Sequence, residues 1–309
     1  MKRNNRNKFY SAIALILVFC FAVVGCTPSS AQTDGEKGTI RMGSKDFTES
    51  IVLAEVYALA LEDAGYKVER TFNIASAVAH TSLVNDEIDV YPEYTGTGLI
   101  AVLGHDPVTD PAEVYRIVSE EYLSKFNLVW LEPTAANDGQ GIVITTEAAE
   151  RYGIKTLSDL QANASNIRFA SQGEFDLRED GLPGLEAVYG PFEFASIQVF
   201  SNALKYDVLQ NGEADAAPAY TTEGQLTQPQ FTLLEDDKQA WPPYHITPVM
   251  RKSVYDANPE AVEVLNAVGK TLDTPTVTAL NAKVDVDKRE YDDVAKEYYD
   301  SIRDTIQIG

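Results

Sequence analysis

Tyrosines, threonines and charged side chains gather at four places in this 309-residue sequence, each where a strand-like segment gives way to a turn or a helix. In proteins that alternate strands and helices, ligands bind at the carboxyl ends of strands and the amino ends of helices. We therefore take these places as the candidate binding segments. They are 43–49 (GSKDFTE), 89–98 (DVYPEYTGTG), 174–182 (EFDLREDGL), and 219–224 (AYTTEG) together with 241–245 (WPPYH).

The first two segments offer groups that could bind an anion and groups that could bind a cation. Ser44 and Lys45 precede a predicted helix, and free N–H groups at a helix start favour an anion. The alternative is that Thr48 simply caps this helix. In the second segment, Tyr94 offers a ring face to a cation and a hydroxyl group to an anion, and Thr97 adds a second hydroxyl. The alternative here is core tyrosines beside a glycine-rich turn.

The other two segments supply an arginine and further rings. The planar guanidinium of Arg178 can hold a carboxylate through two hydrogen bonds. The alternative is a surface ion pair, which contributes little to stability. Tyr220 and Tyr244 each lie next to a predicted strand end, where such rings most often serve packing.

Patterns typical of enzymes are weak in this chain. The histidines His80, His105 and His245 lack metal-ligand spacing, and the sequence contains no nucleophile elbow and no glycine-rich nucleotide loop. With 47 carboxylates, a pair such as Glu93 and Glu174 is weak evidence for a secreted hydrolase. The sequence favours a binding protein without enzymatic activity or cofactor.

The first 25 residues have the pattern of a secretory signal peptide. An apolar run at 12–24, too short to span a bilayer, follows a basic start and ends in Val-Val-Gly-Cys. This ending resembles a bacterial lipobox, which implies cleavage before Cys26 and lipid on its thiol; the alternative is an ordinary signal peptide. Residues 26–38 then read as a polar tether. The basic residues of the start are Lys2, Arg3, Arg6 and Lys8.

The signal pattern predicts that the mature protein lies outside the cytoplasm, and its acidic charge argues against a nucleic-acid partner. The net charge of −22 becomes −26 once the four basic signal residues are removed, and so acidic a protein repels phosphate backbones. The only cysteines are Cys20 and Cys26, so the mature body has no disulfide. No later stretch is apolar enough to span a membrane. We expect an acidic, monomeric, globular body held at the outer face of the cell membrane by its lipid anchor.

The elements that position these segments alternate between strand and helix. Strands are predicted at 38–45, 66–72, 87–91, 129–132, 141–145, 167–170, 214–220 and 245–250. Helices are predicted at 48–64, 76–85, 111–125, 157–162, 182–189, 203–211, 258–272, 276–282 and 287–303. This order predicts an α/β fold, and its length suits two lobes better than one sheet.

The four segments, in this order, resemble the substrate-binding lipoproteins of ABC importers for glycine betaine, carnitine and choline. The resemblance runs from about residue 39 to the C-terminus, and the string Tyr-Pro-Glu-Tyr-Thr-Gly-Thr is its most specific part. It implies a type II-like periplasmic-binding-protein fold with a two-segment hinge and the ligand cleft between the lobes. Lobe one would comprise 39–140 and 244–309, and lobe two 141–243.

The same resemblance implies the ligand and the residues that hold it. A quaternary ammonium solute, captured for osmoprotection and passed to the permease, would sit in a cage of Tyr94, Tyr220 and Tyr244. Its carboxylate would be held near Ser44, Lys45, Thr97 and Arg178.

Two positions depart from the family pattern. Gln140 stands where many members carry a further cage tyrosine, and Ser50 replaces a frequent glutamine. The first departure keeps open a ligand of another class in the same fold, such as an amino acid or a polyamine.

Overall fold

Two five-stranded sheets carry the fold in the computed structural model, which describes residues 37–173, 175–201 and 204–306. The predicted signal segment, the lipidation site Cys26 and the carboxylate of Glu174 lie outside the described residues. All described residues belong to one unit of the chain, Glu36–Gly309.

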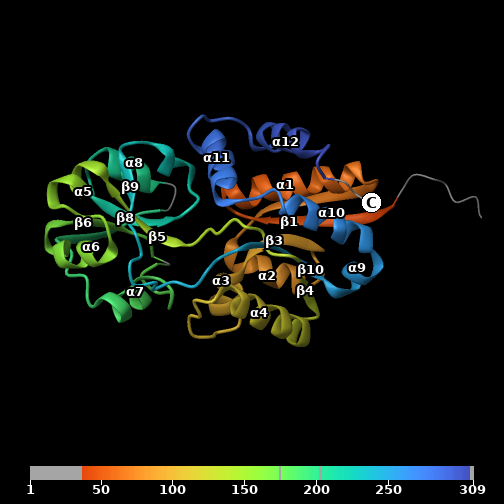
Figure 1. Ribbon diagram of the computed structural model, residues 1–309, viewed down its shortest axis with the longest axis horizontal. Coiled ribbons are helices and arrows are strands. Elements are labelled where there is room, and N and C mark those ends of the chain that lie inside the picture. Colours follow the sequence, from red (N-terminus) through yellow and green to blue (C-terminus); the bar gives the residue numbers. More distant parts are fainter. Residues whose placement is uncertain (1–36, 174, 202–203, 307–309) are drawn as a thin grey trace, which may run out of the picture. The chain divides into compact units, whose positions relative to one another are not determined.

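The first sheet has the strand order β2-β1-β3-β10-β4. β1 is parallel to β2 and β3, whereas β10 is antiparallel to β3 and β4. A late segment of the chain therefore completes a sheet made otherwise of early strands (Figure 1). The bounds are β1 (Lys37–Lys45), β2 (Tyr66–Ile74), β3 (Val90–Tyr94), β4 (Leu128–Trp130) and β10 (Ile246–Arg251).

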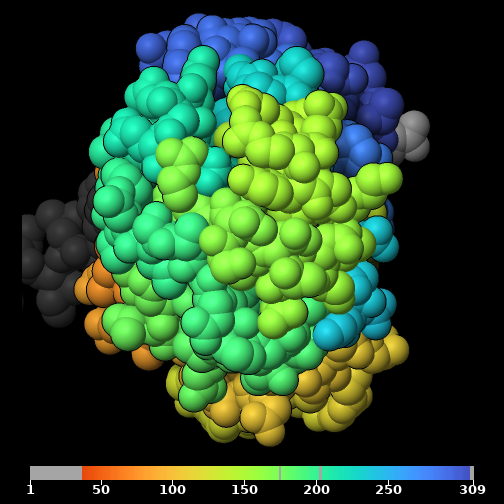
Figure 2. Space-filling model, turned by 90° about the vertical axis from the view of Figure 1, so that its left-hand side faces the viewer, coloured from red at the N-terminus to blue at the C-terminus, as the bar shows by residue number. Residues whose placement is uncertain are grey.

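The second sheet has the order β7-β6-β8-β5-β9 and uses only the middle of the chain. β6 is parallel to β7 and β8, and β5 is antiparallel to β8 and β9. Residues of this part, yellow-green to teal, form most of the face seen in Figure 2. The bounds are β5 (Gln140–Thr145), β6 (Arg168–Ser171), β7 (Ser196–Val199), β8 (Ala216–Tyr220) and β9 (Phe231–Leu233).

Helices connect the strands of both sheets. The bounds associated with the first sheet are α1 (Thr48–Asp63), α2 (Ser76–Val84), α3 (Thr95–Thr97), α4 (Pro111–Phe126), α9 (Lys252–Ala257), α10 (Pro259–Gly269), α11 (Thr274–Asp285) and α12 (Tyr291–Ile302). Those associated with the second are α5 (Thr146–Tyr152), α6 (Leu157–Asn163), α7 (Leu182–Tyr189) and α8 (Lys205–Gln210). Shorter turns also occur, π-helical at Gly98–Val102 and 3-10 at Ala164–Asn166 and Gly224–Thr227. No helix in the described ranges is long and apolar enough to cross a membrane.

Local sequence fixes the ends of α4. The Asp110 side chain accepts a hydrogen bond of 2.8 Å from the N–H of Glu113, and Pro111 occupies the first helical position, where a missing N–H costs nothing. Asn127 ends the helix in the left-handed conformation, with φ of 56°. The predicted 111–125 helix is therefore nearly identical to the observed one.

The start of α1 does not match the alternative that Thr48 caps this helix. Phe47 is the N-cap residue and makes no side-chain cap, while the Thr48 hydroxyl donates to Asp285 at 2.5 Å. The hypothesis that Thr48 caps α1 is therefore wrong. Ser50 instead accepts a hydrogen bond from the N–H of Lys45 at 2.8 Å, which fixes the turn between β1 and α1.

β3 begins three residues later than predicted and extends to Tyr94, which was expected in the turn after the strand. Pro92 explains the error, because proline usually argues against an inner strand. Here β3 pairs with β1 only at Val90, so the missing N–H of Pro92 removes no bond from that ladder. On its other side Pro92 faces Pro248 of β10.

Candidate functional site

Tyr94 ends β3 and is held at both its hydroxyl and its ring. The residue is only 3% exposed, and its hydroxyl donates to Glu49 Oε1 at 2.9 Å. Lys45 Nζ lies 4.9 Å from the centre of the ring, and the Phe47 ring centre lies 5.9 Å away. The ring is thus fixed in place beside a cation of the protein itself.

Lys45 is buried and paired with Glu93. Its ammonium group contacts Glu93 Oε1, which also accepts the N–H of Tyr94 at 2.8 Å. Tyr91 donates to the other oxygen of Glu93 at 2.6 Å. Since Glu93 is 1% exposed and accepts three donors, it serves as a structural counter-ion and not as an accessible acid or base.

Ser44 and Thr97 lie in the same part of the chain but contribute differently. Ser44 is fully buried; its hydroxyl donates to the Lys45 carbonyl and accepts from the N–H of Asn73, both at 3.0 Å. It therefore stabilises the end of β1. Thr97 is half-buried on the short helix α3.

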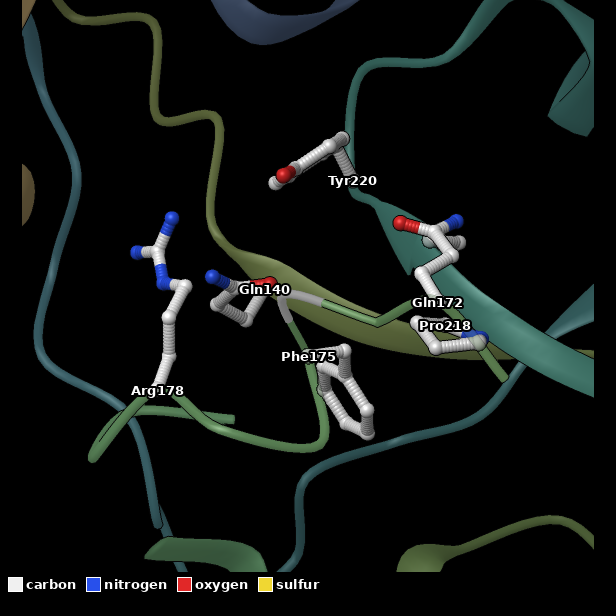
Figure 3. A pocket seen from close by; sticks show the side chains of 7 residues that line it. Gln140, Gln172, Phe175, Arg178, Pro218 and Tyr220 are labelled. Atoms are coloured by element: carbon white, nitrogen blue, oxygen red, sulfur yellow. The ribbon is translucent and has the colours of Figure 1, made fainter. Parts of the chain in front are cut away.

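Gln140, Arg178 and Tyr220 line one pocket. They come from the start of β5, the loop after β6 and the end of β8. Figure 3 shows these three side chains around a common space, with Phe175 beside them. The volume is about 20 Å³, room for about one water molecule. The other lining residues are Gln172, Pro218 and Ala219.

Asp180 connects this pocket to Tyr244. Arg178 donates to both Asp180 oxygens through Nε at 2.7 Å and Nη2 at 2.6 Å. The Tyr244 hydroxyl donates to Asp180 Oδ2 at 2.6 Å, and Trp241 Nε1 donates to the Asp180 carbonyl at 2.7 Å. Burial raises the pKa of Asp180, but the hydrogen bonds and charge of Arg178 outweigh it and leave the pKa below its usual value.

Tyr244 also lies against the segment that carries Tyr94. A Cβ atom at Gly96 would lie 2.6 Å from the Tyr244 ring, so only glycine permits this contact. Tyr244 is 3% exposed. Its ring packs beside α3 of the first sheet, while its hydroxyl reaches Asp180 from the second-sheet part of the chain.

The predicted residues therefore form two groups joined by Tyr244. Gln140, Arg178 and Tyr220 share the pocket, whereas Tyr94 and its neighbours form the buried set beside β1. The surface ion pair considered for Arg178 is instead a half-buried bidentate pair.

Sequence reasoning missed residues that organise these groups. The ammonium of Lys205 lies 5.5 Å from the centre of the Tyr220 ring and pairs with Glu223. The joining role of Asp180 was also missed, although Asp180 lies within a segment that the sequence singled out. Glu49 and Asp138 form a second buried cluster, which the sequence analysis also missed.

Comparisons with known proteins show the family of this chain. The family model for the substrate binding domain of ABC-type glycine betaine transport systems matches residues 38–301. A glycine-betaine-binding protein of Pseudomonas aeruginosa is 34% identical over 92% of this chain and 93% of its own. The chain belongs to this family.

A longer sequence relative and a solved structure are also similar to this substrate-binding protein. An ergothioneine transport permease/ergothioneine binding protein of Helicobacter pylori is 28% identical over 97% of this chain and 54% of its own. A crystal structure of a glycine betaine/carnitine/choline ABC transporter protein has a TM-score of 0.75 at 24% identity, over 86% of this chain and 98% of that one. This last likeness concerns the fold.

Family membership confirms the predicted family, the two-lobed α/β fold and the absence of enzymatic activity. Substrate-binding proteins of ABC importers are extracytoplasmic and work with a permease, so the predicted compartment and partner class are confirmed at that level. The hydrolase alternative is wrong.

Proposed function

We propose that this protein captures glycine betaine or a similar quaternary ammonium solute and delivers it to the permease of an ABC importer. The observation that carries the proposal is the shared pocket of Arg178 and Tyr220, with Tyr244 linked to it through Asp180. The pocket thus combines ring faces for a cation with a guanidinium group that would bind a carboxylate through the N–H groups not used by Asp180.

The chemistry of the ligand explains this combination. A quaternary ammonium group has no N–H donor, so hydrogen bonds cannot select it, whereas aromatic faces attract it by about 0.5–2 kcal/mol each. Tyr220 and Tyr244 would face the cation, with Tyr94 as the third ring and Thr97, Ser44 and Lys45 nearby. Gln140 lines the pocket at the position where the family resemblance implies another ring.

The proposed binding requires movement, because the pocket has room for only about one water molecule. We assign 39–140 with 244–309 to lobe one and 141–243 to lobe two, with the ligand entering as the lobes separate. The two sheets support this division, since β10 returns to the first sheet and β5 to β9 form the second.

The proposed function is tested by titration calorimetry with a ligand panel. We expect glycine betaine, choline or carnitine to bind, because each carries a trimethylammonium group for the rings. Proline and a polyamine are the matched alternatives, since they lack that group. Binding of proline or a polyamine with no binding of any trimethylammonium compound would contradict the assignment.

We further propose that Cys26 becomes the lipid-bearing N-terminus. The lipid would anchor the protein, as a monomer, at the outer face of the cell membrane. The sequence Val-Val-Gly-Cys behind a basic, apolar leader supports this. Mass spectrometry of the native N-terminus is expected to find an acylated Cys26. Cys26→Ala should release the protein from membranes, whereas the matched Cys20→Ala should not. An unmodified mature start at another residue would disprove the anchor.

A further inference from the structure

Glu49 receives hydrogen bonds from three separate segments of the chain. It lies in the first turn of α1 and is 3% exposed. Its Oε1 accepts the Tyr94 hydroxyl at 2.9 Å, and its Oε2 accepts the Thr222 hydroxyl at 2.5 Å and Asn281 Nδ2 at 2.9 Å. One carboxylate thus joins the end of β3, the segment after β8, and α11.

Asp138 places a second carboxyl group against Glu49. It lies on the segment that connects β4 of the first sheet to β5 of the second, and it is 7% exposed. Its Oδ1 accepts the N–H of Thr222 at 3.3 Å, and the hydroxyl of the same threonine donates to Glu49, so Thr222 holds the two carboxyl groups side by side. Its own N–H donates to the Tyr244 carbonyl at 3.1 Å. Asp138 therefore ties the connecting segment to Thr222, after β8, and to Tyr244, before β10.

Two buried carboxyl groups held side by side by Thr222 cannot both be ionised without a large cost. One proton shared by the pair removes that cost and supplies the hydrogen bond between them. Glu49 already accepts three other donors, which favours its ionised form. The proton therefore lies on Asp138, which donates to Glu49.

The charges that face the pair from other elements do not neutralise it. Glu223, after β8, adds a further negative charge near Asp138, and its own ion-pair partner is Lys205. Lys45 of β1 pairs with Glu93 of β3. Burial, followed by the charge of Glu49, raises the pKa of Asp138 well above its usual value, and burial raises that of Glu49 as well.

We propose that Glu49 and Asp138 share one proton and act as positioning residues that hold Tyr94 and the connecting segments in the geometry needed for ligand capture. Loss of that proton places two negative charges in contact and loosens the bonds from Tyr94, Thr222 and Asn281. This inference rests on the proposed function, because its readout in binding uses the quaternary ammonium ligand.

Titration calorimetry with glycine betaine from pH 6 to pH 9 tests the inference, because neither charge of this ligand changes over that range. The wild-type dissociation constant should rise by about tenfold or more as Asp138 ionises. Asp138→Asn keeps a donor for Glu49 and removes the titration, so its affinity should match wild type at pH 6 and change less than about twofold at pH 9. Asp106→Asn removes an equal charge from an exposed site and should behave as wild type.

Thermal unfolding without ligand separates the two proposals. A raised native pKa makes stability fall as pH rises through that pKa, so the melting temperature of the wild type should drop more between pH 6 and pH 9 than that of Asp138→Asn. Equal melting profiles for both proteins would overturn the shared proton, and so would equal pH profiles of binding in proteins that do bind glycine betaine. Failure to bind glycine betaine at any pH, with the expected melting profiles, would overturn the proposed function alone.

Discussion

Replacing Tyr220 by alanine is expected to weaken binding of glycine betaine by about tenfold or more, because the contact between ring and cation contributes about 1–2 kcal/mol in a desolvated site. Tyr220 lines the pocket and is not fully buried, so its removal leaves the core intact. Tyr220→Phe keeps the ring face and should lose much less. Calorimetric titration of both variants measures the difference.

A matched control for this substitution lies far along the sequence. Tyr291, on α12, is 37% exposed and is not among the pocket residues, so Tyr291→Ala should bind as wild type. Equal losses for Tyr220→Ala and Tyr291→Ala would show that the effect does not come from the pocket. Unchanged affinity in Tyr220→Ala would mean that the tyrosine serves packing.

Arg178→Ala should show a larger effect that depends on the ligand. Hydrogen bonds to a carboxylate from a half-buried guanidinium group contribute several kcal/mol, so affinity for glycine betaine should fall about 100-fold. Choline lacks the carboxylate, so its affinity should fall at least about tenfold less than that of glycine betaine. Arg178→Lys keeps the charge without the planar fork and should fall between wild type and alanine for glycine betaine.

The titration with choline also distinguishes a direct contact between Arg178 and the ligand from a role of Arg178 in positioning Tyr244. Arg178 holds Asp180, which in turn accepts the Tyr244 hydroxyl. If Arg178 acted only by positioning Tyr244, both ligands would lose affinity equally. Equal losses for choline and glycine betaine would therefore contradict a direct carboxylate contact.

Sequence patterns predicted the elements well where one signal dominated. The helix at 182–189 was predicted with the bounds that α7 shows, because a proline at its second position and Gly190 mark its ends. The short strands β7 and β9 were missed, since four and three residues of mixed polarity carry no period. The shift of β3 came from Pro92, whose pairing depends on neighbouring strands.

The candidate site was predicted only in part, for a similar reason. Arg178 and Tyr220 could be found because Tyr220 ends a strand and Arg178 lies in the loop after one, and strand ends carry ligand contacts. The bond between Tyr244 and Asp180 joins residues 64 positions apart, and that between Glu49 and Thr222 joins residues 173 apart. Such pairs depend on how the two sheets and their connecting segments fold, which local pattern does not report.

The most direct test of the central claim is to titrate the wild-type protein with glycine betaine and with tert-butylacetate. The two compounds have the same shape and carboxylate, but carbon replaces the charged nitrogen in the second. We expect glycine betaine to bind at least about tenfold more tightly, because the rings attract the cation beyond its apolar surface. Equal affinities, or no binding of glycine betaine, would contradict recognition of a quaternary ammonium group by this site.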